Sequence, residues 1–141
     1  MPLKVYPKKE SLFLIADQIV PNATGKATII GAFAAGQILL SPGASFPATL
    51  PLGVYMVFQD GEGTFKSKIR IIGPDDKSIL GDVLIGDTMK LAGQPLQVNV
   101  NINLFQFSRE GTYKVEILLD DHVYSNNISI RVSETPLVRA S

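Results

Sequence analysis

Five acidic residues in predicted turns are the first candidates for chemistry in this chain. They are Asp60, Glu62, Asp87, Asp120 and Asp121. In a simple succession of antiparallel strands, alternate loops share one end of the fold, so these carboxylates would meet on one rim. Several carboxylates at flexible spacing suit Ca²⁺. Aspartate is also an ordinary turn residue, so the pattern fits either a calcium site or plain turns, and plain turns are the preferred interpretation.

The single histidine, His122, follows Asp120 and Asp121 in a predicted hairpin turn. An imidazole beside carboxylates could act as a base, but acid–base catalysis also needs a reacting partner and a pocket, and the sequence indicates neither. Two glycine-containing segments, Thr24-Gly25-Lys26 and Gly61-Glu62-Gly63, lack the remaining residues of phosphate-binding loops. We therefore predict no catalytic residue, no cofactor and no enzyme.

Two polar rows lie on predicted strands. The row Gln97, Asn99, Asn101 and Asn103 could bind a sugar, but it lacks the aromatic platform that such sites use, so a wet sheet face is the preferred interpretation. The row Lys66, Lys68 and Arg70 could meet phosphates, but charges on one strand more often guard a sheet against wrong pairing.

The charge balance and composition exclude some classes of partner. Lys and Arg number 13, as do Asp and Glu, so no net field draws the chain to nucleic acid or to an anionic membrane. The absence of cysteine excludes disulfides and thiolate sites, and we expect a soluble, cytoplasmic protein. A hydrophobic share of 45% beside 18% charged residues predicts that a protein partner, or a second copy in a homodimer, covers some apolar surface.

Hydrophobic alternation with period two, broken by turn residues, predicts strands from Leu12 to Val132. We predict an all-β fold, an antiparallel β-sandwich of immunoglobulin-like type with about 7 to 9 strands, in which Tyr113 pins a corner. The prolines of residues 35–51 predict a covering loop there. Residues 1–11 would form an N-terminal arm, 12–133 a single domain and 134–141 a tail.

The early strands are apolar on both faces, unlike the later ones. One face must then be covered, either by the predicted loop 35–51 or by a second copy of the chain. The residues assigned to this possible interface are Phe13, Ile15, Ile30, Ala32, Tyr55 and Val57.

Several short segments together resemble a family of uncharacterised small bacterial domains. They are Leu14-Ile15-Ala16-Asp17, Gly25-Lys26, Ile29-Ile30-Gly31-Ala32-Phe33, Gly73-Pro74-Asp75 and Glu110-Gly111-Thr112-Tyr113. The resemblance implies a sandwich fold and a bacterial or bacteriophage origin, and it brings no known activity. That family often has cysteine where Ala16 stands here, which argues against thiol chemistry.

These observations favour a non-enzymatic module for protein interaction or assembly that uses its apolar sheet face or its sheet edges. The alternative is a β-sandwich that binds a small ligand, a carbohydrate or calcium on the acidic loop rim.

Overall fold

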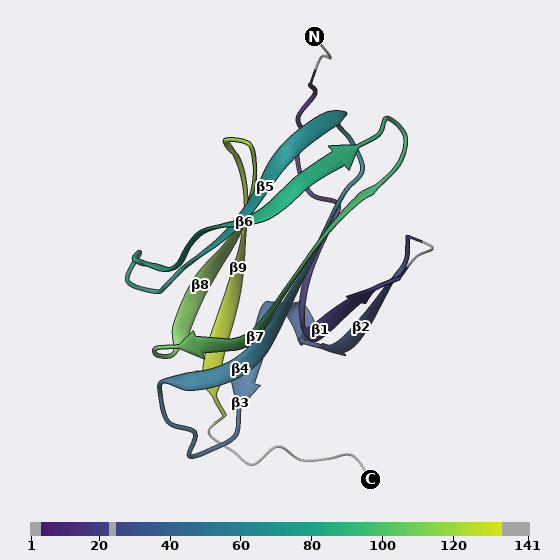
Figure 1. Ribbon diagram of the computed structural model, residues 1–141. Coiled ribbons are helices and arrows are strands. Elements are labelled where there is room, and N and C mark those ends of the chain that lie inside the picture. Colours follow the sequence, from purple (N-terminus) through teal and green to yellow (C-terminus); the bar gives the residue numbers. More distant parts are fainter. Residues whose placement is uncertain (1–3, 23–24, 134–141) are drawn as a thin grey trace.

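β-Strands make up most of the described chain (Figure 1). The computed structural model describes residues 4–22 and 25–133. Their elements are β1 (Leu12–Pro21), β2 (Ala27–Ala32), the short 3-10 turn η1 (Ala34–Gly36), β3 (Gln37–Leu40), β4 (Ala48–Phe58), β5 (Gly63–Ile72), β6 (Ser78–Lys90), β7 (Leu96–Phe107), β8 (Gly111–Leu119) and β9 (His122–Val132). The all-β prediction is confirmed. The predicted tail, residues 134–141, lies outside the described residues.

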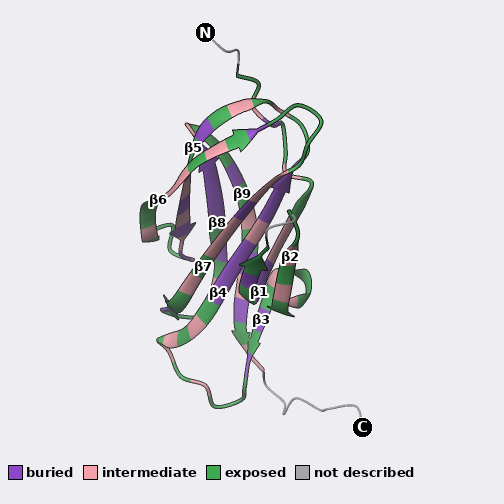
Figure 2. Cartoon of the chain, turned by 45° about the vertical axis from the view of Figure 1, so that its right-hand side comes forward, coloured by how far each residue is buried: buried purple, intermediate pink, exposed green. Residues whose placement is uncertain are grey.

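Two sheets pack against each other. One has the strand order β2-β1-β4-β7 and the other β3-β9-β8-β5-β6. Alternate residues of β4, β5 and β8 point between the sheets, and buried positions run along these strands through the middle of the fold (Figure 2). Such alternation is what period-two patterning produces when one face of each sheet is dry.

The prediction of a loop over residues 35–51 was wrong. The chain there forms η1 and then β3, which pairs with β9 in parallel, and β4 already begins at Ala48. Pro51 is tolerated inside β4 because the pairing of β4 with β7 shifts register between Leu50 and Leu52. A proline without an amide donor fits such a bulge. The predicted antiparallel pairing is confirmed for the other described strand pairs, whereas β3 and β9 run parallel.

Tyr113 holds a corner at the start of β8, as the sequence predicts. Its ring is fully buried, and its hydroxyl donates a hydrogen bond to the carbonyl of Arg109 at 2.6 Å. Phe107 packs edge-on against the ring at 5.2 Å between centroids. The tyrosine thereby fixes the turn that joins the two sheets from β7 to β8.

The outer side of β4 is covered by the chain itself. β1 pairs with β4 only as far as the match between Ala16 and Gly53, and then bends over that glycine. A Cβ atom on Gly53 would lie 3.1 Å from Ile19 Cγ1 and 3.2 Å from the Cα of Gln18. Only a residue without a side chain allows this approach, so Gly53 lets the β1–β2 hairpin lie against the sheet.

The amide row of β7 anchors that hairpin and is not simply a wet face. Asn101 accepts a hydrogen bond from the Ile19 amide and donates one to the Ile19 carbonyl, both at 2.8 Å. Gln97 donates to the carbonyl of Gly25 at the hairpin tip and accepts from the Tyr55 hydroxyl at 3.0 Å. The side chains of β7 thus supply β1 with the backbone partners it loses when it leaves β4.

Replacing Asn101 with alanine tests this anchor. Asn101→Ala removes both bonds to Ile19, so we expect the free energy of unfolding in urea to fall by about 1 to 2 kcal/mol. Asn103, exposed two residues along the same strand, is the matched control, and Asn103→Ala should change stability by less than about 0.5 kcal/mol. Equal losses in the two variants would contradict the anchoring role.

Candidate functional site

Asp120, one of the predicted rim acids, binds the N-terminal arm. Its carboxylate accepts hydrogen bonds from the Tyr6 hydroxyl at 2.7 Å, from Lys4 Nζ at 3.0 Å and from the Lys66 amide at 2.9 Å. Asp120 also sits at a φ of 54°, in the left-handed region that tight turns use. All of its bonding is therefore internal to the chain.

These contacts keep Asp120 ionised. Burial alone would raise the pKa of Asp120, but the hydrogen bonds from Lys66, Tyr6 and Lys4 outweigh burial and lower the pKa from 3.8 to about 2. The same bond to Asp120 raises the pKa of Tyr6, because the carboxylate disfavours a second negative charge beside it. The carboxylate serves as a fixed anion for the arm.

Two of the other predicted rim acids also contact the N-terminal arm. Asp60 accepts a bond from the Lys8 amide at 2.9 Å, and Glu62 exchanges two backbone bonds with Val5 at 2.8 Å. Asp87 lies on β6, and Asp121 is an exposed turn residue. The described residues contain no group of three or more histidine, cysteine or acidic side chains that could hold a metal ion. The predicted rim does not converge on a calcium site.

The single histidine packs against the arm as well. The His122 ring stacks on Tyr6, with centroids 3.7 Å apart and planes within 9°. Beside it, the buried Tyr124 donates to the carbonyl of Pro7 at 2.6 Å, and burial raises the pKa of Tyr124 to about 12. Arm residues 4–10 are therefore closely bound to this end of the fold, and the histidine serves as a packing surface for them.

The six predicted interface residues do not form one surface. Ile15 is fully buried in the core and Val57 is 9% exposed, so neither offers an interface. Phe13 and Tyr55 are half-buried, whereas Ile30 and Ala32 are exposed on β2. In β1 the inward residues are Phe13 and Ile15. The sequence could not show this, since alternation in a strand that is apolar on both sides does not reveal which side faces the core.

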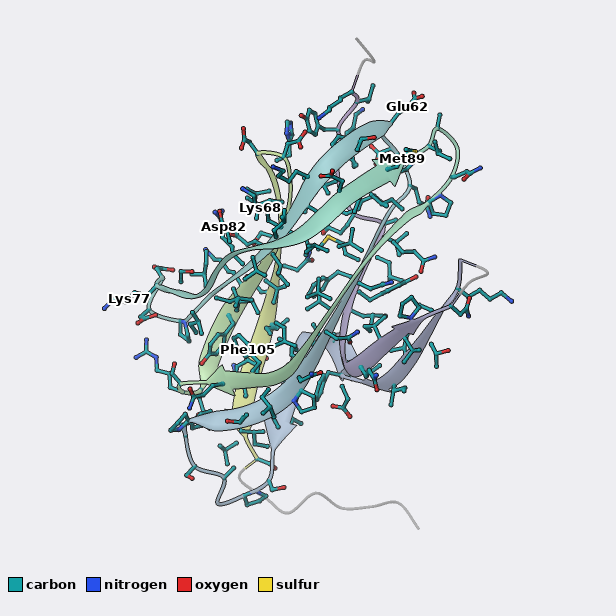
Figure 3. The ribbon with its side chains drawn as sticks, viewed as in Figure 1. Glu62, Lys68, Lys77, Asp82, Met89 and Phe105 are labelled. Atoms are coloured by element: carbon teal, nitrogen blue, oxygen red, sulfur yellow. The ribbon has the colours of Figure 1, made fainter. Side chains whose placement is uncertain are left out.

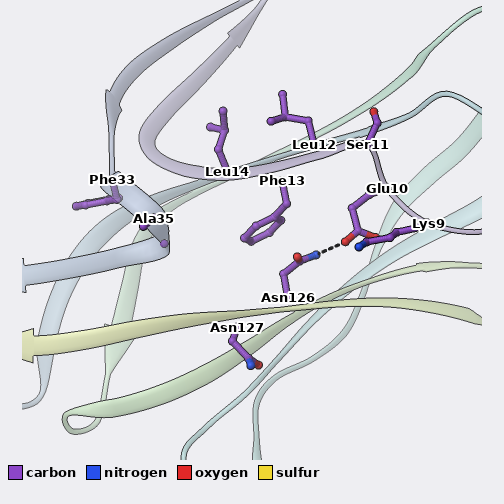
Figure 4. Close-up of a pocket in the computed structure, with 11 residues that line it drawn as sticks. Lys9, Glu10, Ser11, Leu12, Phe13, Leu14, Phe33, Ala35, Asn126 and Asn127 are labelled. Atoms are coloured by element: carbon purple, nitrogen blue, oxygen red, sulfur yellow. Dashed lines mark hydrogen bonds between the residues drawn. The ribbon is translucent and has the colours of Figure 1, made fainter.

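Phe13 points into a groove between β1 and β9 with a volume of about 440 Å³ (Figure 4). Glu10 accepts a bond from Asn126 at 3.1 Å across its mouth, and Phe33 lines its far end. Leu12 and Leu14 point the other way. The groove offers amide and carboxylate groups for hydrogen bonding beside the aromatic rings of Phe13 and Phe33, and Lys9 and Ser11 also line it.

The largest concentration of exposed apolar side chains lies on the edge strand β6. Its exposed residues include Ile79 (37%), Val83 (45%), Leu84 (59%) and Met89 (64%), and Leu91 follows directly at 49%. β6 pairs with β5 on one side, and no other described strand pairs with it on the other. Figure 3 shows Met89 near the end of β6 and Asp82 further back along the strand. None of the six interface residues predicted from the sequence lies on β6.

Three register shifts interrupt the pairing of β6 with β5. They leave extra residues on β6 that bulge and twist the strand, as natural sheet edges often do. The regular stretch from Gly86 to Lys90 pairs residue by residue with Ser67 to Gly63. Its opposite edge is therefore the straightest place for another strand to bind.

Among the described residues, no helix is long and apolar enough to cross a membrane.

Acid titration tests the role of Asp120. The folded chain lowers the pKa of Asp120, so its stabilisation is complete above about pH 4 and is lost as the pH falls through about 2. Asp120→Asn should reduce the free energy of unfolding by about 1 kcal/mol at pH 7, a value discounted for partial exposure, and by less at pH 2.5. Urea unfolding at both pH values measures this difference.

The exposed neighbour Asp121 provides the matched control. Asp121→Asn should leave stability within about 0.5 kcal/mol of the original chain at either pH. The difference in free energy of unfolding between Asp120→Asn and the original chain should shrink from pH 7 to pH 2.5. A constant difference would show that the charge on Asp120 does not hold the arm.

No curated protein matches the chain. Among solved structures, a β-glucosidase from Listeria innocua aligns at a TM-score of 0.39, with 9% identity over 86% of this chain and 16% of the enzyme. A β-glucosidase from Erythrobacter marinus aligns at 0.40, with 12% identity over 70% of this chain and 14% of the enzyme. This chain thus spans a small part of either enzyme, and similarity at this level supports no argument.

A match to a protein-family model covers all of the described strands. The model of a family of unknown function, DUF6941, matches residues 11–133, from the residue before β1 to the one after β9. The predicted resemblance to uncharacterised domains is confirmed, and the chain belongs to this family of unknown function.

Proposed function

We propose that the two packed sheets form an immunoglobulin-like β-sandwich. The supporting observation is the strand order, in which β1, β4 and β7 lie in one sheet and β5, β8 and β9 in the other. The tyrosine corner at Tyr113 stands at the start of β8, after the crossing from β7, where immunoglobulin-like domains place it. In this assignment β3 is the short strand that joins the second sheet alongside β9.

The function that fits this domain best is a non-enzymatic module that binds a partner protein through the free edge of β6. The exposed apolar side chains of that strand are the observation on which the proposal rests. An edge strand offers unpaired backbone donors and acceptors, and a partner strand can satisfy them while covering apolar area worth about 25 cal/mol per Å². Leu84 and Met89 would contribute most of that area.

A non-enzymatic role agrees with the chemistry of the described residues. His122 is stacked on Tyr6, and Asp120 is occupied by three donors from its own chain. General acid–base catalysis needs such groups directed toward a substrate pocket. Here they stabilise the arm.

Charge substitutions on β6 test the proposal. Leu84→Lys and Met89→Lys place charge on side chains that are 59% and 64% exposed, so the fold should survive, which circular dichroism and thermal melts will check. The immobilised original chain should retain a protein from extracts of its source cells. Each variant should retain about 10% or less of that amount, because a charge in a buried contact costs several kcal/mol.

Leu104→Lys is the matched control, since Leu104 is 76% exposed but lies on β7. It should retain the partner as the original chain does. Equal retention by all variants, measured by quantitative mass spectrometry, would rule out β6 as the binding edge.

A further inference from the structure

The outer face of β6 alternates acidic and apolar residues. Opposite residues in an antiparallel pair share a face, and Leu84, Asp87 and Met89 lie opposite the outward residues Lys68, Lys66 and Thr64 of β5. Asp82 joins them, because its carboxylate lies 3.7 Å from the outward Arg70. The outward positions of β6 are therefore, in order, Asp82, Leu84, Asp87 and Met89.

These positions do not complement a second copy of the same strand. We consider antiparallel pairs in which the extra residue of β6 between Leu84 and Gly86 stays unpaired in each copy, as it does against β5. Alignment of Leu84 with the Met89 of a second copy then brings the two Asp87 carboxylates together. Alignment of Leu84 with its own equivalent sets Asp82 against Asp87. A third register, intermediate between these two, places Leu84 against Asp87 and Met89 against Asp82. Like charges across a strand pair, or a carboxylate against an apolar side chain, destabilise pairing.

We propose that β6 binds an extended segment of a different protein whose outward residues alternate between cationic and apolar. This inference rests on the proposed function and names the chemistry of the partner. Lysine or arginine of the partner would lie opposite Asp82 and Asp87, and its aliphatic side chains would lie opposite Leu84 and Met89. Each carboxylate of β6 would then stand between a cation of β5 and a cation of the partner.

A hollow at the end of β6 gives the partner's last apolar side chain a place to pack. A cavity of about 450 Å³ lies there, and Thr64, Met89 and Leu91 form part of its wall. Met89 and Leu91 are both largely exposed at present. A side chain opposite Met89 would cover both of them, so the hollow extends the apolar contact beyond the strand.

A pair of synthetic peptides tests the charge pattern. The probe is Thr-Val-Thr-Lys-Thr-Val-Thr-Lys-Thr, and the matched control replaces both lysines with glutamate. Fluorescence polarisation at low salt should show the lysine peptide binding the full chain at least about tenfold more tightly, because two exposed ion pairs replace two repulsive pairs. Salt at roughly 0.5 M should reduce the preference.

A charge exchange within the protein makes the test specific to β6. The double variant Lys66→Asp with Asp87→Lys keeps opposite charges across β5 and β6 while reversing the sign at the free edge. It should lose the preference for lysine at that position, so the two peptides should bind within about threefold of each other. Leu84→Lys should weaken the lysine peptide at least tenfold, and Leu104→Lys should not.

Three results would overturn the inference. They are equal binding of the two peptides to the original chain, a preference left unchanged by the charge exchange, and self-association of the original chain in sedimentation that Leu84→Lys abolishes. The proposed function would survive each of them if a partner from cell extract is still lost with Leu84→Lys and kept with Leu104→Lys, so the two failures are distinguishable.

Discussion

Burial of β4 on both of its sides is the constraint on which the rest of the structure depends. Its inward residues, among them Val54 and Met56, are fully buried between the sheets. Its outward side is closed at Gly53, where β1 crosses at van der Waals distance. Since a strand buried on both faces must be apolar throughout, this geometry explains why alternation is lost there and kept in the later strands.

Self-coverage then decides which surface remains for a partner. The β1–β2 hairpin covers the outer side of β4, where Ile19 bonds to Asn101. The N-terminal arm covers the end of the fold at the β8–β9 turn, where Tyr6 bonds to Asp120. Both arrangements use polar side chains to satisfy backbone or hydroxyl groups, which buried segments require. Among the described strands, β2, β7, β3 and β6 each end a sheet, and β6 carries more exposed large apolar side chains than any of the other three.

The sequence predicts the fold better than the site, for physical reasons. Period-two patterning locates the strand at Leu96 because one of its faces is buried and the other is not. The corner at Tyr113 is predictable because its hydroxyl bonds to nearby Arg109. Patterning fails for residues 35–51, since a proline is tolerated where a bulge removes the need for its amide, and bulges depend on the partner strand. It also fails for Asp120 and Asn101, whose roles depend on residues more than 80 positions away in the chain.

The irregular pairing of β6 explains how an edge with exposed apolar residues can remain selective. A flat, regular edge would accept many strands, including its own copy, and would aggregate. The bulges confine regular pairing to Gly86–Lys90, where Asp87 disfavours strands of the wrong charge pattern, and Asp82 does the same beyond the first bulge. Apolar area supplies attraction without discrimination, whereas charge order supplies discrimination at little cost in affinity. An edge that combines the two is suited to recognising one kind of partner.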